Sequence, residues 1–347
     1  MISDLNNRSR EILKLVVESY VETGSPIGSR TLSKRLSENI SPATIRNVLA
    51  DLEEYGLLYA PHVSAGRLPT DAGMRLFVDG LLEIGNLSDT ERHQIEAQCK
   101  SSGISYGKVL EQAGNLMSGL SACAGLVVAP KLDTQRLKHV EFVSLGPGRA
   151  LVVMVSEEGQ VENRVLELPI GVTPSILAEA SNYLSAHLIG RNLNEARKLI
   201  QDEIKSNKAM IHELSSNLVE AGLATWSDSS DQGVLIVRGQ SNLLQDVSAM
   251  GDLENIRTLF TALETKENLV RLMDLTHDAE GVQIFIGAEN ELFSVTGCSM
   301  IISPYKNSEE QIVGAIGVVG PTRMNYARII PMVDYTSKVI SEMLRKK

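Results

Sequence analysis

Apolar side chains in the first part of the chain recur at helical spacing in three successive segments. Within each segment most of them are three or four positions apart, so they fall on one face of a helix. The positions are Ile12, Leu13, Val16 and Tyr20 in the first segment, Leu32 and Leu36 in the second, and Ile45, Val48, Leu49 and Leu52 in the third. The pattern predicts three short helices whose apolar faces share one small core.

Local signals delimit the third of these helices. Ser41 is a good N-cap, Pro42 suits the first helical position, and Gly56 can adopt the left-handed conformation that ends a helix. Residues 57–70 then read as a strand, a tight turn and a returning strand, with Gly66 free to adopt a positive φ. Two helices joined by a short turn and followed by a hairpin are typical of a winged helix-turn-helix, which places one helix in the major groove of DNA.

The third predicted helix turns small and polar side chains away from its apolar stripe. Asn and Arg can make bidentate contacts with adenine and guanine when no bulky apolar group holds the backbone away from the bases. The predicted DNA contacts are Thr44, Arg46 and Asn47 at or near bases, Ser41 and Arg30 at phosphates, and Arg67 and His62 from the hairpin to the backbone or minor groove. The alternatives are a solvated face of an ordinary helical bundle and a helix pair that binds protein.

Charge is distributed unevenly along the chain, which has a formal net charge of −10. Residues 1–80 carry nine Lys and Arg against ten Asp and Glu, and residues 81–347 carry 24 against 33. Residues 24–50 differ, because Arg30, Lys34, Arg35 and Arg46 outnumber the single acid Glu38 there. We therefore expect positive potential where the helix pair would meet phosphates, with modest affinity per copy and a need for two copies to hold a site.

Five motifs stand near the two ends of the chain. They are LNNR at residues 5–8, GSPIGSRTL at 24–32, SPATIRN at 41–47, GRLPT at 66–70 and GVVGPTRMNYAR at 317–328. These motifs resemble those of the HrcA family of bacterial heat-inducible transcription repressors. Because they occur at opposite ends in the expected order, the resemblance spans nearly the full length and not only a common DNA-binding module.

The resemblance implies a homodimer that binds an inverted-repeat operator in double-stranded DNA and represses chaperone operons. It also implies an activity that depends on the chaperonin GroEL, and a GAF-like sheet domain interrupted by an inserted dimerising domain. A protein with two-fold symmetry requires a DNA site with two-fold symmetry. The alternative function is a winged-helix regulator controlled by a small effector bound in the GAF-like domain.

Beyond the hairpin the chain has the pattern of a multidomain α+β protein. Helical segments to residue 99 are followed by strand patterns in two groups, at 125–168 and 282–320, with about a hundred mostly helical residues between them. This order indicates one domain interrupted by another. The predicted division is 1–82 for the winged-helix DNA-binding domain, 83–104 for a helical linker, 105–173 with 278–347 for the GAF-like domain, and 174–277 for the mainly helical inserted domain.

A glycine-rich strand pattern ends at Pro321, and Thr322 can cap the helix that follows. Thr322 and Arg323 have two interpretations, an anion-binding ligand pocket and a structural junction between sheet and helix. The chain has no GxxxxGK[ST] loop that would cradle a phosphate. The junction is therefore the favoured interpretation.

Catalysis, metal binding, secretion and membrane insertion find little support in the residues. The sequence has no GxSxG or HExxH motif, and its six histidines and three cysteines show no zinc-ligand spacing. No apolar run approaches the roughly 18–20 residues that cross a bilayer, and the first residues lack an apolar signal core. We expect a cytoplasmic, non-enzymatic protein without metal or cofactor, whose cysteines are reduced and packed.

Overall fold

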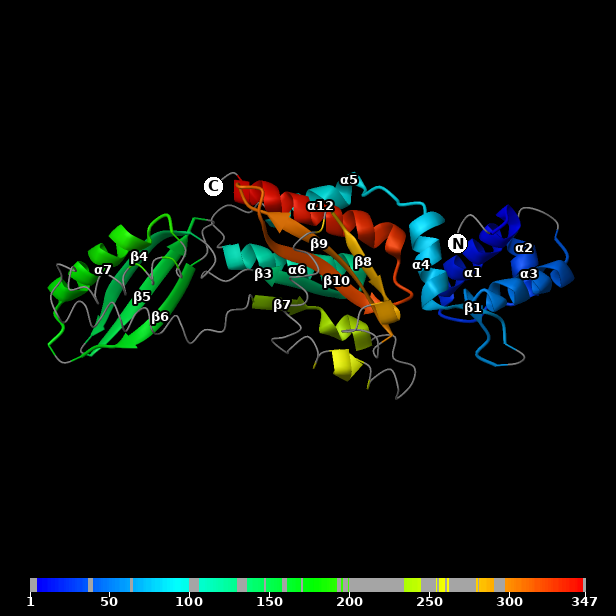
Figure 1. Ribbon diagram of the computed structural model, residues 1–347, viewed down its shortest axis with the longest axis horizontal. Coiled ribbons are helices and arrows are strands. Elements are labelled where there is room, and N and C mark those ends of the chain that lie inside the picture. Colours follow the sequence, from blue (N-terminus) through cyan, green and yellow to red (C-terminus); the bar gives the residue numbers. More distant parts are fainter. Residues whose placement is uncertain are drawn as a thin grey trace.

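The computed structural model describes residues 5–36, 40–62, 65–99, 106–129, 136–146, 148–157, 161–169, 171–191, 195, 199, 234–244, 254, 256–259, 261, 279, 281–289 and 297–345. Three parts follow one another along the longest axis of the molecule (Figure 1). We call them the N-terminal module (residues 5–80), the central body (a five-stranded sheet with its helices) and the distal unit (a three-stranded sheet with one helix). The N-terminal module and the distal unit lie at opposite ends (Figure 1).

Three helices form the core of the N-terminal module, namely α1 (Asn7–Thr23), α2 (Ser29–Arg35) and α3 (Pro42–Glu54). Asn6 caps α1 by accepting the Ser9 N–H at 2.9 Å, and Gly24 ends it with a φ of 65°. The predicted stripes are buried, with Tyr20 packed against them as the one partly exposed member. The three helices inferred from apolar spacing are therefore confirmed.

A small antiparallel hairpin follows α3. Strand β1 (Leu58–Tyr59) pairs with β2 (Leu68–Pro69), and a further bridge joins Ile27, just before α2, to Arg67. Gly66 lies beside this bridge, where a Cβ would overlap the main chain of Ile27. The positive φ expected at this residue is wrong, because Gly66 is not among the glycines with a left-handed backbone. A glycine is needed here for close approach of two main chains.

Helix α4 (Asp71–Gly80) leads from the hairpin toward the central body (Figure 1). Thr70 caps it, with its hydroxyl accepting the Gly73 N–H at 3.1 Å. Helix α5 (Asp89–Cys99) occupies part of the segment predicted as a helical linker, and α6 (Tyr106–Ser121) follows.

The central body is built on an antiparallel sheet of order β7-β3-β10-β9-β8. Its strands are β3 (Ala124–Ala129), β7 (Val234–Arg238), β8 (Gln283–Ile286), β9 (Cys298–Lys306) and β10 (Ile312–Pro321). Helices α5, α6 and α12 (Tyr326–Arg345) contribute to the apolar core on one face. The short 3-10 helix Gln240–Leu244 and residues 256–259 pack on the other face, so both faces of the sheet are covered.

The distal unit is a separate antiparallel sheet of order β4-β5-β6, covered on one face by α7 (Pro174–Leu188). Its strands are β4 (Leu137–Gly146), β5 (Arg149–Ser156) and β6 (Val161–Glu167). The expectation that residues 105–173 contribute all their strands to one sheet domain is wrong. Strand β3 already has β7 on one edge and β10 on the other, which leaves no free edge for β4. Strand β7 was placed in the inserted domain and instead pairs with β3.

Helix α7 lies in the segment 174–277 that was predicted to be mainly helical, and most of the remainder of that segment lies outside the described residues. Cys99, Cys123 and Cys298 are buried thiols. Among the helices that the structure describes, none combines the length and apolar character needed to cross a membrane.

Candidate nucleic-acid interface

Helix α3 is delimited by the signals read from its sequence. The Ser41 hydroxyl accepts the Thr44 N–H at 3.1 Å, and Pro42 follows at the first helical position. At the other end, Gly56 adopts a φ of 70°. The inner face of α3 is buried in the module core, so the helix can roll only at the expense of that core.

The opposite face of α3 is open to solvent. Ala43, Arg46, Asn47 and Ala50 are exposed, and Thr44 is half-buried at the edge of this face. Small side chains at two of these positions leave room for the helix backbone to approach another surface. The structure places Asn47 on this open face, with Thr44 and Arg46 at its two edges, all in the N-terminal half of α3.

The charges of α3 are divided between its two ends. Arg46 lies in the N-terminal half, whereas Asp51, Glu53 and Glu54 lie in the last turn. The unpaired N–H groups at a helix N-terminus add a partial positive charge there. A polyanion is therefore attracted to the N-terminal half and repelled from the C-terminal turn.

The hydroxyls of Ser41 and Thr44 are engaged with each other. Their oxygen atoms are 2.9 Å apart, in addition to the capping bond from the Thr44 N–H. Ser41 therefore serves first to fix the start of α3. With its hydroxyl directed toward Ser41, Thr44 can offer its methyl group, which suits apolar contact with a thymine methyl.

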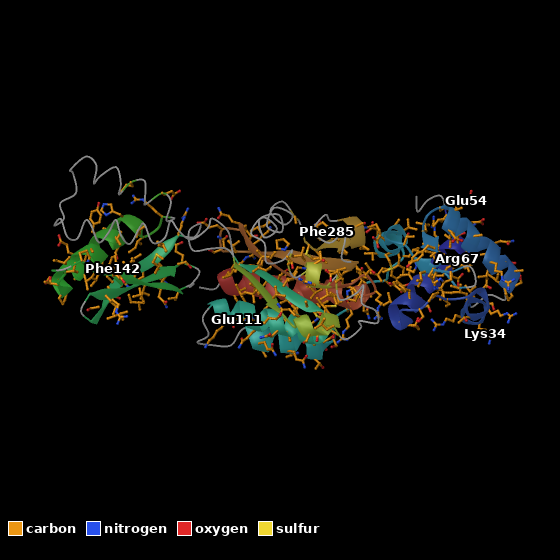
Figure 2. The ribbon with its side chains drawn as sticks, turned by 90° about the horizontal axis from the view of Figure 1, so that it is seen from below. Lys34, Glu54, Arg67, Glu111, Phe142 and Phe285 are labelled. Atoms are coloured by element: carbon orange, nitrogen blue, oxygen red, sulfur yellow. The ribbon has the colours of Figure 1, made fainter. Side chains whose placement is uncertain are left out.

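Arg67, which we expected to reach the DNA backbone or minor groove from the hairpin, forms contacts within the N-terminal module. Its main chain pairs with Ile27, and its guanidinium forms an ion pair with Glu53 of α3, with Nη2 and Oε2 2.8 Å apart. Figure 2 shows Arg67 inside the N-terminal module, with Glu54 and Lys34 toward its outer edges. Arg67 therefore ties the hairpin to the third helix, which is a positioning role. His62 is exposed at the start of the hairpin turn.

The local excess of basic residues is partly used inside the module. Arg35 pairs with Glu22 of α1, with Nη1 and Oε2 3.1 Å apart. Arg30 and Lys34 of α2 and Arg46 of α3 are exposed. These three cations carry the exposed positive charge of the helix pair that Arg35 does not share with Glu22.

Thr322 and Arg323 lie at a junction between two parts of the molecule. The Thr322 carbonyl accepts the Tyr326 hydroxyl at 2.9 Å, at the start of α12. The Arg323 guanidinium lies against Gly24 at the C-terminal end of α1, so close that a Cβ on Gly24 would be 3.1 Å from Nη1. A cation at a helix C-terminus is favourable. The structure favours the junction over the ligand pocket, and Arg323 connects the central body to the N-terminal module.

The sequence pattern missed two groups of functional interest. Glu53 gave no sign that it would hold Arg67, because a single acid in a helix is usually solvated. Asp71 and Arg75 of α4 contact the turn that follows β8, more than two hundred residues away in sequence. Their spacing of four residues places both on one face of a helix, but the partner is invisible without the fold.

The three-helix module with an open polar helix face, joined to an α/β body, defines a multidomain α+β transcription regulator. Residues 107–330 match the family model described as the HrcA protein C terminal domain. The chain belongs to the HrcA family and is a transcription repressor.

Relatives named heat-inducible transcription repressor HrcA align over nearly the whole chain. The protein of Brucella canis is 52% identical over 99% of this chain and 98% of its own length. That of Mesorhizobium japonicum is 52% identical over 99% of this chain and 96% of its own length. A solved structure titled as a hypothetical protein has the same fold, with a TM-score of 0.71, 24% identity and 99% coverage of both chains.

Proposed function

We propose that this chain binds double-stranded DNA as a homodimer, with α3 as the recognition helix of a winged helix-turn-helix in the major groove. Its target is an inverted repeat in the operators of chaperone operons. The observation that carries the proposal is the N-terminal half of α3, which is capped, anchored from behind and open on a face of small, polar and cationic side chains. Such a face suits the base edges of the major groove.

The roles of individual residues follow from their exposure. Arg46 and Asn47 can reach base edges, and Thr44 can approach a thymine methyl. Arg30 lies on α2, which in such modules crosses the DNA backbone, so a phosphate is its expected partner. Ser41 contributes through the start of α3, and Arg67 through the hairpin that it holds against α3. His62 is the remaining candidate for a contact with the DNA backbone.

A homodimer is supported by the uncovered face of the distal sheet. Val155 pairs with Val161, and Leu151 pairs with both Val143 and Val165, so these side chains project from the face opposite to α7. Val143, Val161 and Val165 are 40%, 51% and 56% exposed. A run of aliphatic side chains of this kind on an antiparallel sheet is suited to burial against a second copy of itself.

The dimer surface can be tested with one substitution. Val165→Lys places a charge in the middle of the apolar face, and we expect the dimer dissociation constant to rise at least about 30-fold, since burial of an unpaired charge costs several kcal/mol. Asn182→Lys, at an exposed position of α7, is the matched control and should leave dimerisation unchanged. Sedimentation equilibrium measures both. Equal dissociation constants for the two variants would remove this face from the interface.

Two parts of the resemblance remain to be assigned to the fold. We take the central body as the GAF-like domain and the distal unit, with residues onward toward 233, as the inserted dimerising domain. The distal unit lies in the chain between β3 and β7, which are neighbours in one sheet, and this order supports an insertion. Because repressors act on chromosomal DNA, we also propose a cytoplasmic location.

The operator can be identified by selection of bound DNA from a random pool, followed by titration of the enriched sequence. We expect an inverted repeat with half-sites about one helical turn, or a multiple of it, apart. Binding should decrease when one half-site is scrambled or reversed into a direct repeat. A pool without any enriched sequence would refute the proposal.

Dependence on GroEL is the part of the proposal that links repression to heat. Val128 of β3 pairs with Ala315 of β10, about 190 residues later in sequence, so the central sheet closes only after a long segment has been accommodated. Slow closure exposes apolar strands to aggregation and makes assistance by a chaperonin useful. The test is recovery of operator binding after dilution from denaturant without chaperonin. Full recovery at every temperature and protein concentration would refute the dependence on GroEL.

A further inference from the structure

Two residues on one face of α4 form hydrogen bonds and an ion pair with the turn that follows β8. The Asp71 carboxylate accepts the N–H of Ala288 at 3.0 Å. One helical turn later, Arg75 donates from Nε to Oε1 of Glu289 at 2.7 Å, and a second bond joins Nη2 to Oε2. Nη2 also donates to the Ile284 carbonyl of β8 at 2.6 Å.

The backbone of the turn after β8 allows these contacts. Gly287 has a φ of 52°, and a Cβ there would overlap the Asp71 carboxylate. The Glu289 carboxylate is oriented by the Ile286 N–H, which donates to Oε2 at 2.8 Å. Burial alone would raise the pKa of Glu289, but hydrogen bonds from Arg75 and from the Ile286 N–H, with the charge of Arg75, bring it below its ordinary value. A bidentate pair fixes direction as well as distance.

Polar contacts also occur elsewhere at the boundary between the N-terminal module and the central body, around a cavity. A cavity of about 320 Å³ lies between α1, α4 and residues 324–327. Two polar contacts lie near this cavity. The Arg323 guanidinium lies against Gly24, and Lys14 of α1 forms an ion pair with Glu83 at 2.8 Å. Apolar side chains of both parts belong to one core cluster, and the directional polar contacts add orientation to this packing.

From this geometry we infer that Asp71, Arg75 and Glu289 form a clamp that fixes the orientation of the recognition helix relative to the central body and thereby sets the half-site spacing that the dimer accepts. This inference rests on the proposed function. The N-terminal module lies at the opposite end of the molecule from the distal sheet (Figure 1). If the subunits join through that sheet, the central bodies are held in place, and a rotation at the clamp turns and displaces the two α3 helices relative to each other.

The spacing of DNA half-sites changes in steps that such a clamp can distinguish. One inserted base pair moves a half-site by about 3.4 Å and turns it by about 34°, since B-DNA has 10–10.5 base pairs per turn. A rigidly oriented pair of recognition helices accepts one spacing well, whereas loosely attached helices accept several spacings with lower affinity for each. The clamp residues are thus positioning residues for operator binding.

The test measures operator affinity for full-length wild type, Glu289→Gln, Arg75→Gln and the double variant. The DNA is a series of the selected operator in which the spacing between half-sites ranges from two base pairs shorter to two base pairs longer than the selected one. We expect each single variant to bind the best spacing roughly tenfold more weakly and to lose less at the other spacings. The double variant should resemble Arg75→Gln, because removal of Arg75 already breaks the pair with Glu289 together with the bond to the Ile284 carbonyl. Asp334→Asn removes a negative charge and an exposed ion pair on α12, and it is the matched control.

A second measurement is independent of DNA. Spin labels at Glu54→Cys and Ser308→Cys, both exposed, report the distance between α3 and the central body. Glu289→Gln should broaden this distance distribution, and Asp334→Asn should not. An unchanged distribution in Glu289→Gln overturns the clamp, as does a wild-type spacing profile in that variant. If wild type shows no spacing preference while the distribution broadens, the proposed operator mode is wrong and the clamp stands as an orienting contact.

Discussion

Asn47→Ala tests the recognition helix most directly. Asn47 is exposed on α3, between Arg46 and the buried Val48, so truncation leaves no cavity. Alanine is also a better helix former than asparagine, by up to about 0.7 kcal/mol. The variant should therefore fold as well as wild type, and any loss of binding reports the DNA contact.

The expected magnitude follows from one bidentate amide contact per half-site. Such a pair discriminates the correct base by about 1–3 kcal/mol, which corresponds to about 5- to 150-fold in affinity. A homodimer on an inverted repeat contains the substitution twice, so the factors for the two half-sites multiply when both are engaged. Binding to random DNA depends on phosphate contacts and should change little.

The assay is a fluorescence-anisotropy titration on the selected operator and on random DNA at one fixed salt concentration. Asn86→Ala is the matched control, because Asn86 is also exposed but lies between α4 and α5, away from α3. We expect the ratio of specific to random affinity to fall for Asn47→Ala only. An equal loss on both DNAs would refute base contact by Asn47, and a normal ratio would exclude it from recognition.

Two further results follow from backbone contact and charge. Gly66→Ala should destabilise the N-terminal module by about 1–3 kcal/mol, the usual range for overpacking, because the added Cβ overlaps the Ile27 main chain. Urea unfolding measures this loss, and unchanged stability would contradict the close approach of the two main chains. The pKa of Glu289 is lowered, so its stabilisation is present above the ordinary carboxyl pKa and is lost as the pH falls through the folded-state pKa. The difference in unfolding free energy between wild type and Glu289→Gln should therefore shrink from neutral to acidic pH. Arg75 remains charged over this range, and Asp71 and Asp79 are the other acids on that face of α4. A constant difference would assign the stabilisation to something other than the charge.

Local periodicity predicted the elements whose determinants are local. The boundaries of α3 follow from Ser41, Pro42 and Gly56, all within a few residues of the helix ends. The exposed face of α3 followed from the same pattern, since burial of one stripe defines the opposite side. Candidate recognition residues were therefore accessible from the sequence.

Contacts between distant segments could not be predicted in this way. The pattern of apolar positions predicted strands at 150–155 and 161–168, which are β5 and β6, but neither β4 beside them nor a separate sheet. Strand partners depend on which edges the rest of the fold occupies. Arg67 was expected to contact DNA from the hairpin, and its ion pair with Glu53 becomes visible only when hairpin and helix are placed together. Arg323 and Gly24 are almost three hundred residues apart and meet only at the junction.

Charge, dimerisation and orientation depend on one another in this molecule. Residues 81–347 carry nine more acids than bases, so most of the chain is repelled by DNA, and the attraction that we propose comes from Arg30, Lys34 and Arg46 of the N-terminal module. Few phosphate contacts per copy mean weak binding by one module, and two linked modules gain affinity only when both can engage together. The geometry of their attachment then matters as much as the contacts themselves. A repressor built in this way is selective because a site must match both the base sequence read by α3 and the separation imposed by the junction.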